Sequence, residues 1–311
     1  MELIQNKKNA KINPSKVIYI PNDRLSKKLF NLSDENFRDA CQEPTNLIEI
    51  KNHKKFGKIS SPFLIIVDEQ LSFTLSEPLD QFDFDVLIIC ISEYHVDNYF
   101  ITPAIIYRGL TGKVGRCDAE PSKDQLNAIM HSLEKLMFLK IDITMNKLCE
   151  KTDYNNGKKF KIVAPILPAE YTTEIIINGK SSTVIHLLEE SPIWRIACLK
   201  NHQFLSFNSE LLDIPRQQNT KLNIMTKFYV LRRVLEIILH NMTSTITLQD
   251  VFKNCRIENA HVETKRRVRE FMLAFFEHLK TKKIIKSFEI VKHGNTFYSI
   301  KFTYSKPKKK S

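Results

Sequence analysis

Apolar and polar residues alternate most regularly toward the end of the chain. The spacing predicts a short helix over Thr247–Cys255 and a longer helix that runs from Thr264, its expected cap, to about Lys282. Two runs rich in β-branched and aromatic residues, Ile284–Ile290 and Thr296–Phe302, follow as strands. The polar triplet 293–295 between them contains a glycine and predicts a tight turn. One side of the longer helix is apolar and is expected to face a core; its residues are Val268, Phe271, Met272, Phe275, Phe276 and Leu279.

A second stretch has the same order of elements. Thr102 followed by Pro103 predicts a helix start, and this helix is expected to end near Gly112. Ser122 with Gln125 three residues later matches a capping box and opens the next helix. Ile141–Thr144 and Phe160–Ile166 are then predicted as two strands.

Three landmarks of these stretches recur at almost the same interval. Thr102 corresponds to Thr247, Ser122 to Thr264 and Ile141 to Ile284, which gives offsets of 145, 142 and 143 residues. A near-constant interval between independent signals indicates two copies of one module. Because the residue identities do not repeat, chance agreement of common helix signals is the alternative.

Three further segments complete the prediction. Phe82–Tyr94 precedes the first copy; its apolar run Val86–Ile91 is compatible with a buried strand, but the helix starts that follow favour a helix. Apolar residues from Ile224 to Met242 recur at spacings of four and three, which predicts a long amphipathic helix before the second copy. Between the copies, an Asn178-Gly179 turn is expected to join strands over 172–188 in a hairpin.

Helix, helix and hairpin, in that order, form a winged helix, which is a helix-turn-helix with a β-hairpin attached. The predicted fold class is therefore α+β, with two winged-helix domains in tandem, an inserted β-hairpin and an irregular N-terminal region that holds short strands at Lys16–Ile20 and Pro62–Val67. The predicted divisions are residues 1–80 (arm and short strands), 81–216 (first winged helix with the hairpin), 217–303 (second, DNA-binding winged helix) and 304–311 (basic tail).

Net charge changes this picture, because it is unevenly distributed. Residues 1–221 contain 28 Lys and Arg and 28 Asp and Glu. Residues 222–311 hold the remaining 19 Lys and Arg (47 less 28) against 7 Asp and Glu (35 less 28), so the whole net charge of +12 lies there. A basic surface of this kind suits a polyanion, most commonly a nucleic acid. A solvated basic surface without a partner is the alternative.

The basic residues at the start of the longer helix are the candidate chemistry. On a helical wheel of about 100° per residue, Arg266, Glu270 and Leu273 lie opposite the apolar side. Arginine can hold a guanine edge, and glutamate can accept from a cytosine amine. Leu273 is expected to be exposed and suits a thymine methyl or a protein contact. Arg267 and Arg269 lie on the flanks and are placed for phosphates. The candidate DNA-binding residues are Lys265, Arg266, Arg267, Arg269, Glu270, Leu273, Lys280, Lys282, Lys283, Lys286 and Lys292.

The equivalent helix of the first copy presents a near-neutral surface. Asp124, Ala128, His131 and Lys135 are expected opposite its apolar side. Such a surface suits weak base reading or contact with a second copy of the chain.

Two modules of one layout, the second strongly basic, resemble the tandem winged-helix replication initiators of plasmids and related mobile elements. The residues that carry the likeness are Phe82–Leu87, Ile101–Gly112 and the block Thr264–Phe302, within roughly residues 80–302. The likeness is one of architecture, without a short invariant signature. It implies binding to repeated origin sites in double-stranded DNA, a first module that forms homodimer contacts or reads a second half-site, and recruitment of host helicase or primase.

The sequence gives little support to other classes of function. The histidines include no His-x-His pair and the chain has no Gly-x4-Gly-Lys-Ser/Thr loop, so we expect no enzyme activity, no catalytic residue and no cofactor. The six cysteines have no zinc-ligand spacing, so no metal site is expected, and they are typical of reduced thiols in a cytoplasmic protein. The start of the sequence and its short apolar runs predict neither a signal peptide nor a membrane-spanning segment. A transcriptional regulator of the same fold and a winged-helix protein–protein adaptor remain the alternatives.

Overall fold

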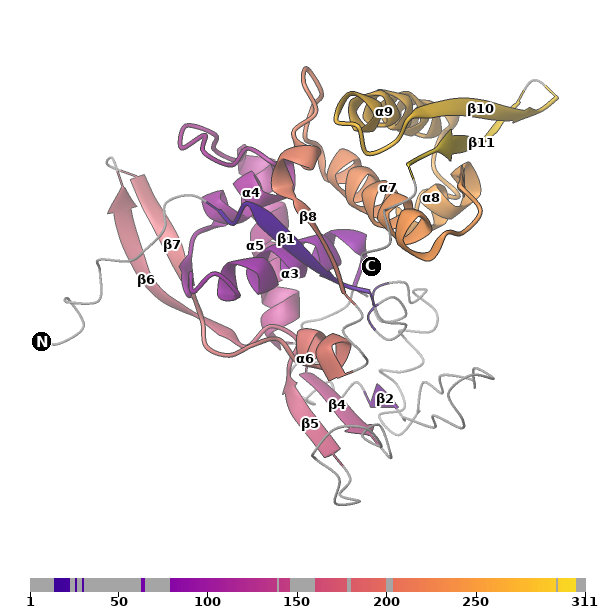
Figure 1. The fold of residues 1–311 in the computed structure, drawn as a ribbon. Coiled ribbons are helices and arrows are strands. Elements are labelled where there is room, and N and C mark those ends of the chain that lie inside the picture. Colours follow the sequence, from indigo (N-terminus) through magenta and orange to yellow (C-terminus); the bar gives the residue numbers. More distant parts are fainter. Residues whose placement is uncertain are drawn as a thin grey trace, which may run out of the picture.

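The chain combines helices with antiparallel sheets, so the predicted α+β class is confirmed (Figure 1). This computed structural model describes residues 14–22, 26, 30, 63–64, 79–138, 140–145, 160–177, 180–199, 204–294 and 296–305. Most of the predicted N-terminal region, the turn residues Asn178 and Gly179, and the basic tail from residue 306 lie outside these ranges.

The elements follow one another in two similar series. The first comprises α3 (Gln81–Tyr94), β3 (Phe100–Ile101), α4 (Pro103–Thr111), α5 (Lys123–Phe138), β4 (Lys140–Met145) and β5 (Phe160–Pro165). The second comprises α7 (Lys221–His240), β9 (Thr245–Thr247), α8 (Leu248–Asn254), α9 (Val262–Thr281), β10 (Ser287–His293) and β11 (Thr296–Thr303). Between them lie β6 (Ala169–Ile177), β7 (Lys180–Leu187), α6 (Pro192–Leu199), β8 (Phe204–Asn208) and the 3-10 turn η2 (Ser209–Leu212). The short strands β1 (Val17–Pro21) and β2 (Phe63–Leu64) precede both.

The local signals in the sequence place most of these elements correctly. The Thr102 side chain accepts from the Ile105 amide, Pro103 is the first helical residue, and Gly112 ends α4 in the left-handed conformation. The capping box at the start of α5 is also confirmed: the Ser122 amide donates to Gln125 Oε1 at 2.8 Å and the Gln125 amide donates to Ser122 Oγ at 3.4 Å. These contacts span three or four residues, so the sequence alone can encode them.

Helix α3 confirms the helical interpretation of 82–94, and the strand alternative is wrong. All its residues from Gln81 to Glu93 are buried, because α4, α5, α7 and β1 pack around it. A helix that is covered on every side needs no polar face, so its sequence carries no amphipathic period.

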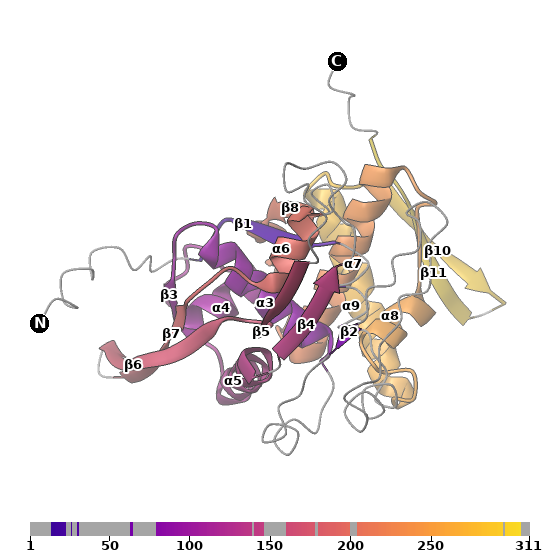
Figure 2. The same cartoon turned by 90° about the horizontal axis from the view of Figure 1, so that it is seen from below.

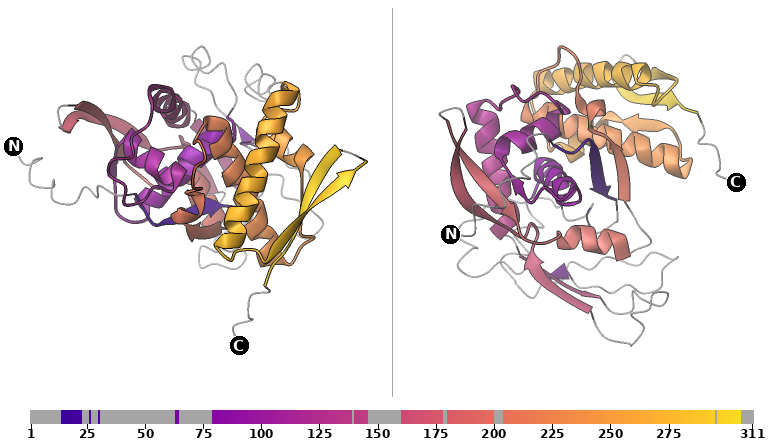
Figure 3. Two further views of the ribbon diagram at one scale, coloured as in Figure 1. Left: turned by 90° about the horizontal axis from the view of Figure 1, so that it is seen from above. Right: turned by 60° about the vertical axis from the view of Figure 1, so that its left-hand side comes forward.

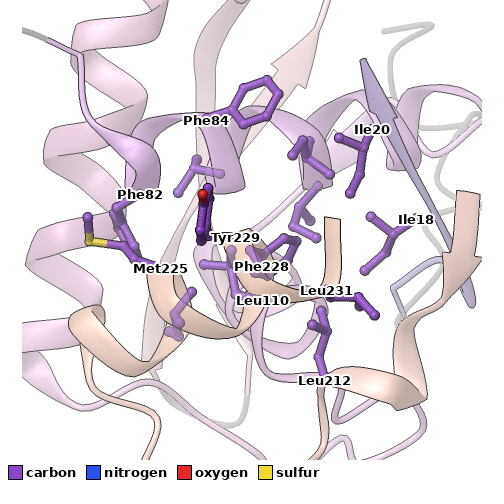
Figure 4. Close-up of a cluster of buried hydrophobic side chains, with 14 of the residues drawn as sticks. Ile18, Ile20, Phe82, Phe84, Leu110, Leu212, Met225, Phe228, Tyr229 and Leu231 are labelled. Atoms are coloured by element: carbon purple, nitrogen blue, oxygen red, sulfur yellow. The ribbon is translucent and has the colours of Figure 1, made fainter. Parts of the chain in front are cut away.

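The core is continuous from the first series to the second. Figure 4 shows Ile18 and Ile20 from β1, Phe82 and Phe84 from α3, and Phe228 and Leu231 from α7 converging on one cluster. Helix α7 contacts both α3 and α9, so it belongs to both halves of the molecule. The predicted boundaries at residues 80, 216 and 303 stay predictions.

The two series differ in how their strands pair. In the second, β9 pairs with β11 and closes a three-stranded sheet with the β10–β11 hairpin. In the first, β3 pairs with β7 instead, and the β4–β5 hairpin pairs with β2. The order of elements therefore repeats, while the sheets are built differently. In Figures 1 and 2 the β6–β7 and β10–β11 hairpins project from opposite ends of the molecule.

A left-handed residue ends the second helix of each series. Gly112 (φ 74°) follows α4, and Arg256 (φ 54°) follows α8, an offset of 144 residues (256 less 112). This agrees with the interval between the sequence landmarks. Glycine is needed at the first position because an added Cβ would lie 2.5 Å from the Ser209 carbonyl oxygen.

Two predicted boundaries in the second series are wrong. Helix α9 begins at Val262 with His261 as its cap, three residues before the predicted cap Thr264, and the Lys265 amide already donates to the His261 carbonyl at 3.2 Å. Strand β10 begins at Ser287 and not at Ile284. The reason is the end of α9: Lys283 is left-handed (φ 60°), and the Ile284 amide turns back to the Leu279 carbonyl at 3.0 Å.

The expected exposure of Lys135 is also wrong. Lys135 is buried, and its Nζ lies 2.6 Å from Asp83 Oδ2 on α3. Ser132 Oγ donates to Asp83 Oδ1 at 2.7 Å, and the Asp80 amide donates to Oδ2 at 2.8 Å. Burial nevertheless raises the pKa of Asp83. Lys135 is buried because α5 packs against α3, which carries its partner Asp83, and a helical wheel of α5 alone does not include that neighbouring helix.

Removing Lys135 should therefore destabilise the protein. Lys135→Met leaves the Asp83 carboxylate buried without its cation, which should lower the free energy of unfolding by about 3–5 kcal/mol. Lys123→Met, at an exposed position in the first turn of the same helix, is the control and should change it by less than about 0.5 kcal/mol. Urea unfolding measures both; equal effects would contradict the buried ion pair.

Alanine substitutions at Gly112 and Gly115 can be compared directly to test the contact between α4 and η2. Both are left-handed (φ 74° and 85°), but a Cβ at Gly115 meets no atom within 4 Å. Gly115→Ala should cost about 1–2 kcal/mol for the backbone alone, and Gly112→Ala about 2–5 kcal/mol because η2 must also move. Thermal unfolding of the two variants checks this, and similar costs would show that the α4–η2 contact adapts freely.

Candidate nucleic-acid interface

Helix α9 is half buried, as its sequence pattern predicts. Val268, Phe271, Met272, Phe275, Phe276 and Leu279 are all buried. Arg266, Arg267 and Glu270 are exposed on the outer side. Figure 3 shows α9 on the outside of the molecule with the β10–β11 hairpin beside it. The helix thus presents a charged side to solvent while its other side packs in the core.

Two carboxylates hold the arginines of the first turns. Arg266 donates from Nε to Glu263 Oε2 at 2.8 Å and from Nη2 to Glu263 Oε1 at 2.7 Å, and it also forms an ion pair with Glu270. Arg267 Nε donates to Glu263 Oε1 at 3.1 Å. Hydrogen bonds from Arg266 and then Arg267 lower the pKa of Glu263 to about 2, so it is ionised at neutral pH. Ion pairs this exposed are weak, so another anion can replace the carboxylate as the partner of the arginine.

The side chains of Lys265 and Arg269 are less exposed than those of Arg266 and Arg267 and lie against the protein. The Lys265 ammonium donates to the Glu258 carbonyl oxygen and lies 5.8 Å from the centre of the Phe252 ring. Arg269 Nε donates to the Lys265 carbonyl oxygen at 3.3 Å. Both side chains are half-buried. Lys265 thus links the start of α9 to α8 and the turn that follows α8, whereas the bond of Arg269 stays within α9.

Leu273 corrects one feature of the predicted surface. It is half-buried and packs against the core, so it is not an exposed apolar contact. Long helical side chains lie down over the preceding turn, which a wheel of Cα directions does not show.

The lysines of the predicted set lie elsewhere. Lys280 pairs with Glu277 at 3.2 Å, and Lys282, Lys283 and Lys286 are exposed where α9 ends. At 1.5 Å per residue, Lys280 in the last turn of α9 is about 21 Å along the helix from Arg266. Lys292 is exposed on β10, next to a bulge in the hairpin. The structure therefore divides the predicted residues into an arginine group at the start of α9, a lysine group at its end and one lysine on the hairpin.

The sequence analysis did not identify two features of this surface, namely the Glu263 carboxylate and a pair of stacked rings on the hairpin. Glu263 fell in a predicted loop, because the helix was expected to begin at Thr264; its spacing of three and four residues to Arg266 and Arg267 was the available signal. On the hairpin, the His293 and Tyr298 rings stack at 4.1 Å between centroids, and both residues are exposed. No local sequence signal pairs residues across a hairpin whose register is unknown.

The surface of α5 in the first series is different. Asp124 and His131 are exposed there, whereas Lys135 is buried and Ala128 packs against the core. The start of this helix thus lacks the arginine group of α9.

Comparisons with known proteins yield only distant structural similarity. No family model matches the chain, and no curated protein matches it. A crystal structure of RctB domains 2-3 aligns with a TM-score of 0.39 and 12% identity, covering 71% of this chain and 80% of that one. A second, of selenomethionine derivatives of domains 2 and 3 of RctB, aligns with a TM-score of 0.38 and 11% identity, covering 88% and 98%. Similarity at this level transfers no function.

Among the described residues, no group of three His, Cys, Asp or Glu side chains could hold a metal ion. None of the described helices is long and apolar enough to cross a membrane.

Proposed function

We propose that this protein binds double-stranded DNA through its C-terminal half, with the outer side of α9 toward the duplex, and that it acts as a replication initiator at repeated sites. One observation carries the DNA-binding proposal. The whole net charge of +12 lies in residues 222–311, and of the basic residues described there only Lys227 and Arg232 are buried. The others reach the surface, where they can meet phosphates.

The arrangement of the C-terminal half supports a winged-helix mode of binding. Helices α8 and α9 are joined by a short turn, and the β10–β11 hairpin with β9 forms the attached sheet. Proteins of this kind place the second helix in the major groove, with its first residues on base edges. Arg266 and Glu270 would read bases, and Arg267 and Arg269 would hold phosphates.

The repeated order of elements supports the initiator role over a single-module regulator. A protein with two related units can engage two adjacent half-sites or pair with a second copy, as the sequence resemblance implies. In this proposal the protein binds and assembles, with homodimer contacts and host helicase or primase as its partners, and performs no chemistry itself. An origin-dependent replication assay with a plasmid that carries the preferred sites tests the role; site-specific binding without replication would indicate a transcriptional regulator.

DNA binding should depend strongly on salt. The log of the affinity should fall with log salt concentration by about 0.9 for each phosphate contact neutralised. Fluorescence anisotropy with a labelled duplex at several salt concentrations measures this. The full chain should be used, since removal of residues 1–216 would expose the buried side of α7. A flat salt response would contradict the electrostatic basis of the proposal, and salt-sensitive binding without any site preference would favour an adaptor.

Arg266 and Arg269 should behave differently. Arg266→Ala should cost about 1–3 kcal/mol at the preferred site and relax the preference at one or two base pairs. Arg269→Ala should weaken binding to all duplexes alike and reduce the salt slope by about one. Binding of both variants to preferred and scrambled duplexes at two salt concentrations decides the matter. A uniform loss from Arg266→Ala, with site preference unchanged, would show that α9 is not in the major groove.

A further inference from the structure

The arginines that should contact DNA are already engaged within the free protein. Glu263 accepts from both Arg266 and Arg267, and Glu270 takes Arg266 from the next turn. The four side chains are 41–74% exposed, so the cluster faces solvent on the outer side of α9. The two negative charges offset the two positive ones at the point where the helix would approach the duplex.

This arrangement treats phosphates and bases differently. A phosphate that binds Arg266 or Arg267 comes close to the carboxylates that already hold these arginines, so like charges repel each other. A guanine–cytosine pair offers acceptors for the arginine and, on the cytosine, an amine that donates to a carboxylate. Both charges of the cluster can therefore be satisfied by a base pair, whereas the phosphate backbone satisfies only the arginine.

We propose that Glu263 is a specificity-determining residue, which suppresses non-specific phosphate binding by Arg266 and Arg267 and favours a guanine–cytosine pair opposite the start of α9. This inference rests on the proposed DNA binding. Glu263 acts mainly by positioning the two arginines. A purely structural role is the competing explanation, since an acidic residue in the first turn stabilises a helix and its pairs at three and four residues add to that.

The test compares full-length Glu263→Gln with the wild type. Glutamine keeps the shape of the side chain and removes the charge that holds both arginines. Affinity for a scrambled duplex should rise roughly three- to tenfold, because the two weak ion pairs of Glu263 no longer compete. The salt slope should steepen by about one to two as the freed arginines reach phosphates. The ratio of specific to non-specific affinity should fall, and sites selected from random duplexes should lose a guanine–cytosine preference.

Two controls separate positioning from net charge. Glu210→Gln makes the same charge change at an exposed position in η2 and should alter the scrambled-duplex affinity by less than about twofold. In an Arg266→Ala, Arg267→Ala background, Glu263→Gln should have no larger effect than Glu210→Gln, since its action requires those arginines. Thermal unfolding confirms that each variant folds.

The outcomes are distinct. A rise in scrambled-duplex affinity no larger than that of Glu210→Gln would overturn the inference, and so would an equal rise on specific and scrambled duplexes. An effect that persists without the two arginines would overturn it as well. Failure of the wild-type chain to bind any duplex at low salt would instead reject the proposed function.

Discussion

The packing of α7 against α3 is the contact on which the rest of the structure depends. Both helices are buried along most of their length, and α7 also supports α9. Polar contacts surround this interface: Lys221 pairs with Asp80 at 2.8 Å, and Arg256 donates to the Leu79 carbonyl at 2.7 Å. Because the two halves share one hydrophobic cluster, the outer side of α9 has a fixed place relative to the first series.

Charges within this interface have a different role from those on α9. Asp85 is fully buried, and burial raises its pKa well above the usual range. Lys227 donates to the Leu212 carbonyl at 2.9 Å and to Asn219 Oδ1 at 3.1 Å, and burial lowers its pKa to about 7. The Arg232 guanidinium lies 5.5 Å from the Phe84 ring and 5.7 Å from the Tyr229 ring. Buried charges cost desolvation energy, so we attribute to Arg232 the fixing of α7 against α3, and to Lys227 the fixing of α7 against η2, and not a gain in stability.

On the surface the same residue types can exchange partners. Arg266 and Arg267 are solvated and held by carboxylates of their own helix, so a ligand that offers partners to both the arginines and the carboxylates can replace these contacts. The basic C-terminal half therefore combines a rigid interior, set by α7, with charged groups on α9 that remain available for a ligand. The lysines at the end of α9 and on the hairpin widen the positive surface without sharing in that cluster.

The sequence by itself determined the features that depend on neighbours within about four residues and on composition. Helix caps at Thr102, Ser122 and Thr247, the apolar stripe of α9 and the charge asymmetry could all be predicted for this reason. Only the tertiary structure decided the pairing of β1 with β8, nearly 190 positions later in the chain, and of β3 with β7 in place of β5. It also decided that Lys135 is buried and that α9 begins early enough for Glu263 to hold two arginines. Strand partners and burial are set by segments far apart in sequence, whose meeting depends on the packing of the whole core, and no local pattern records them.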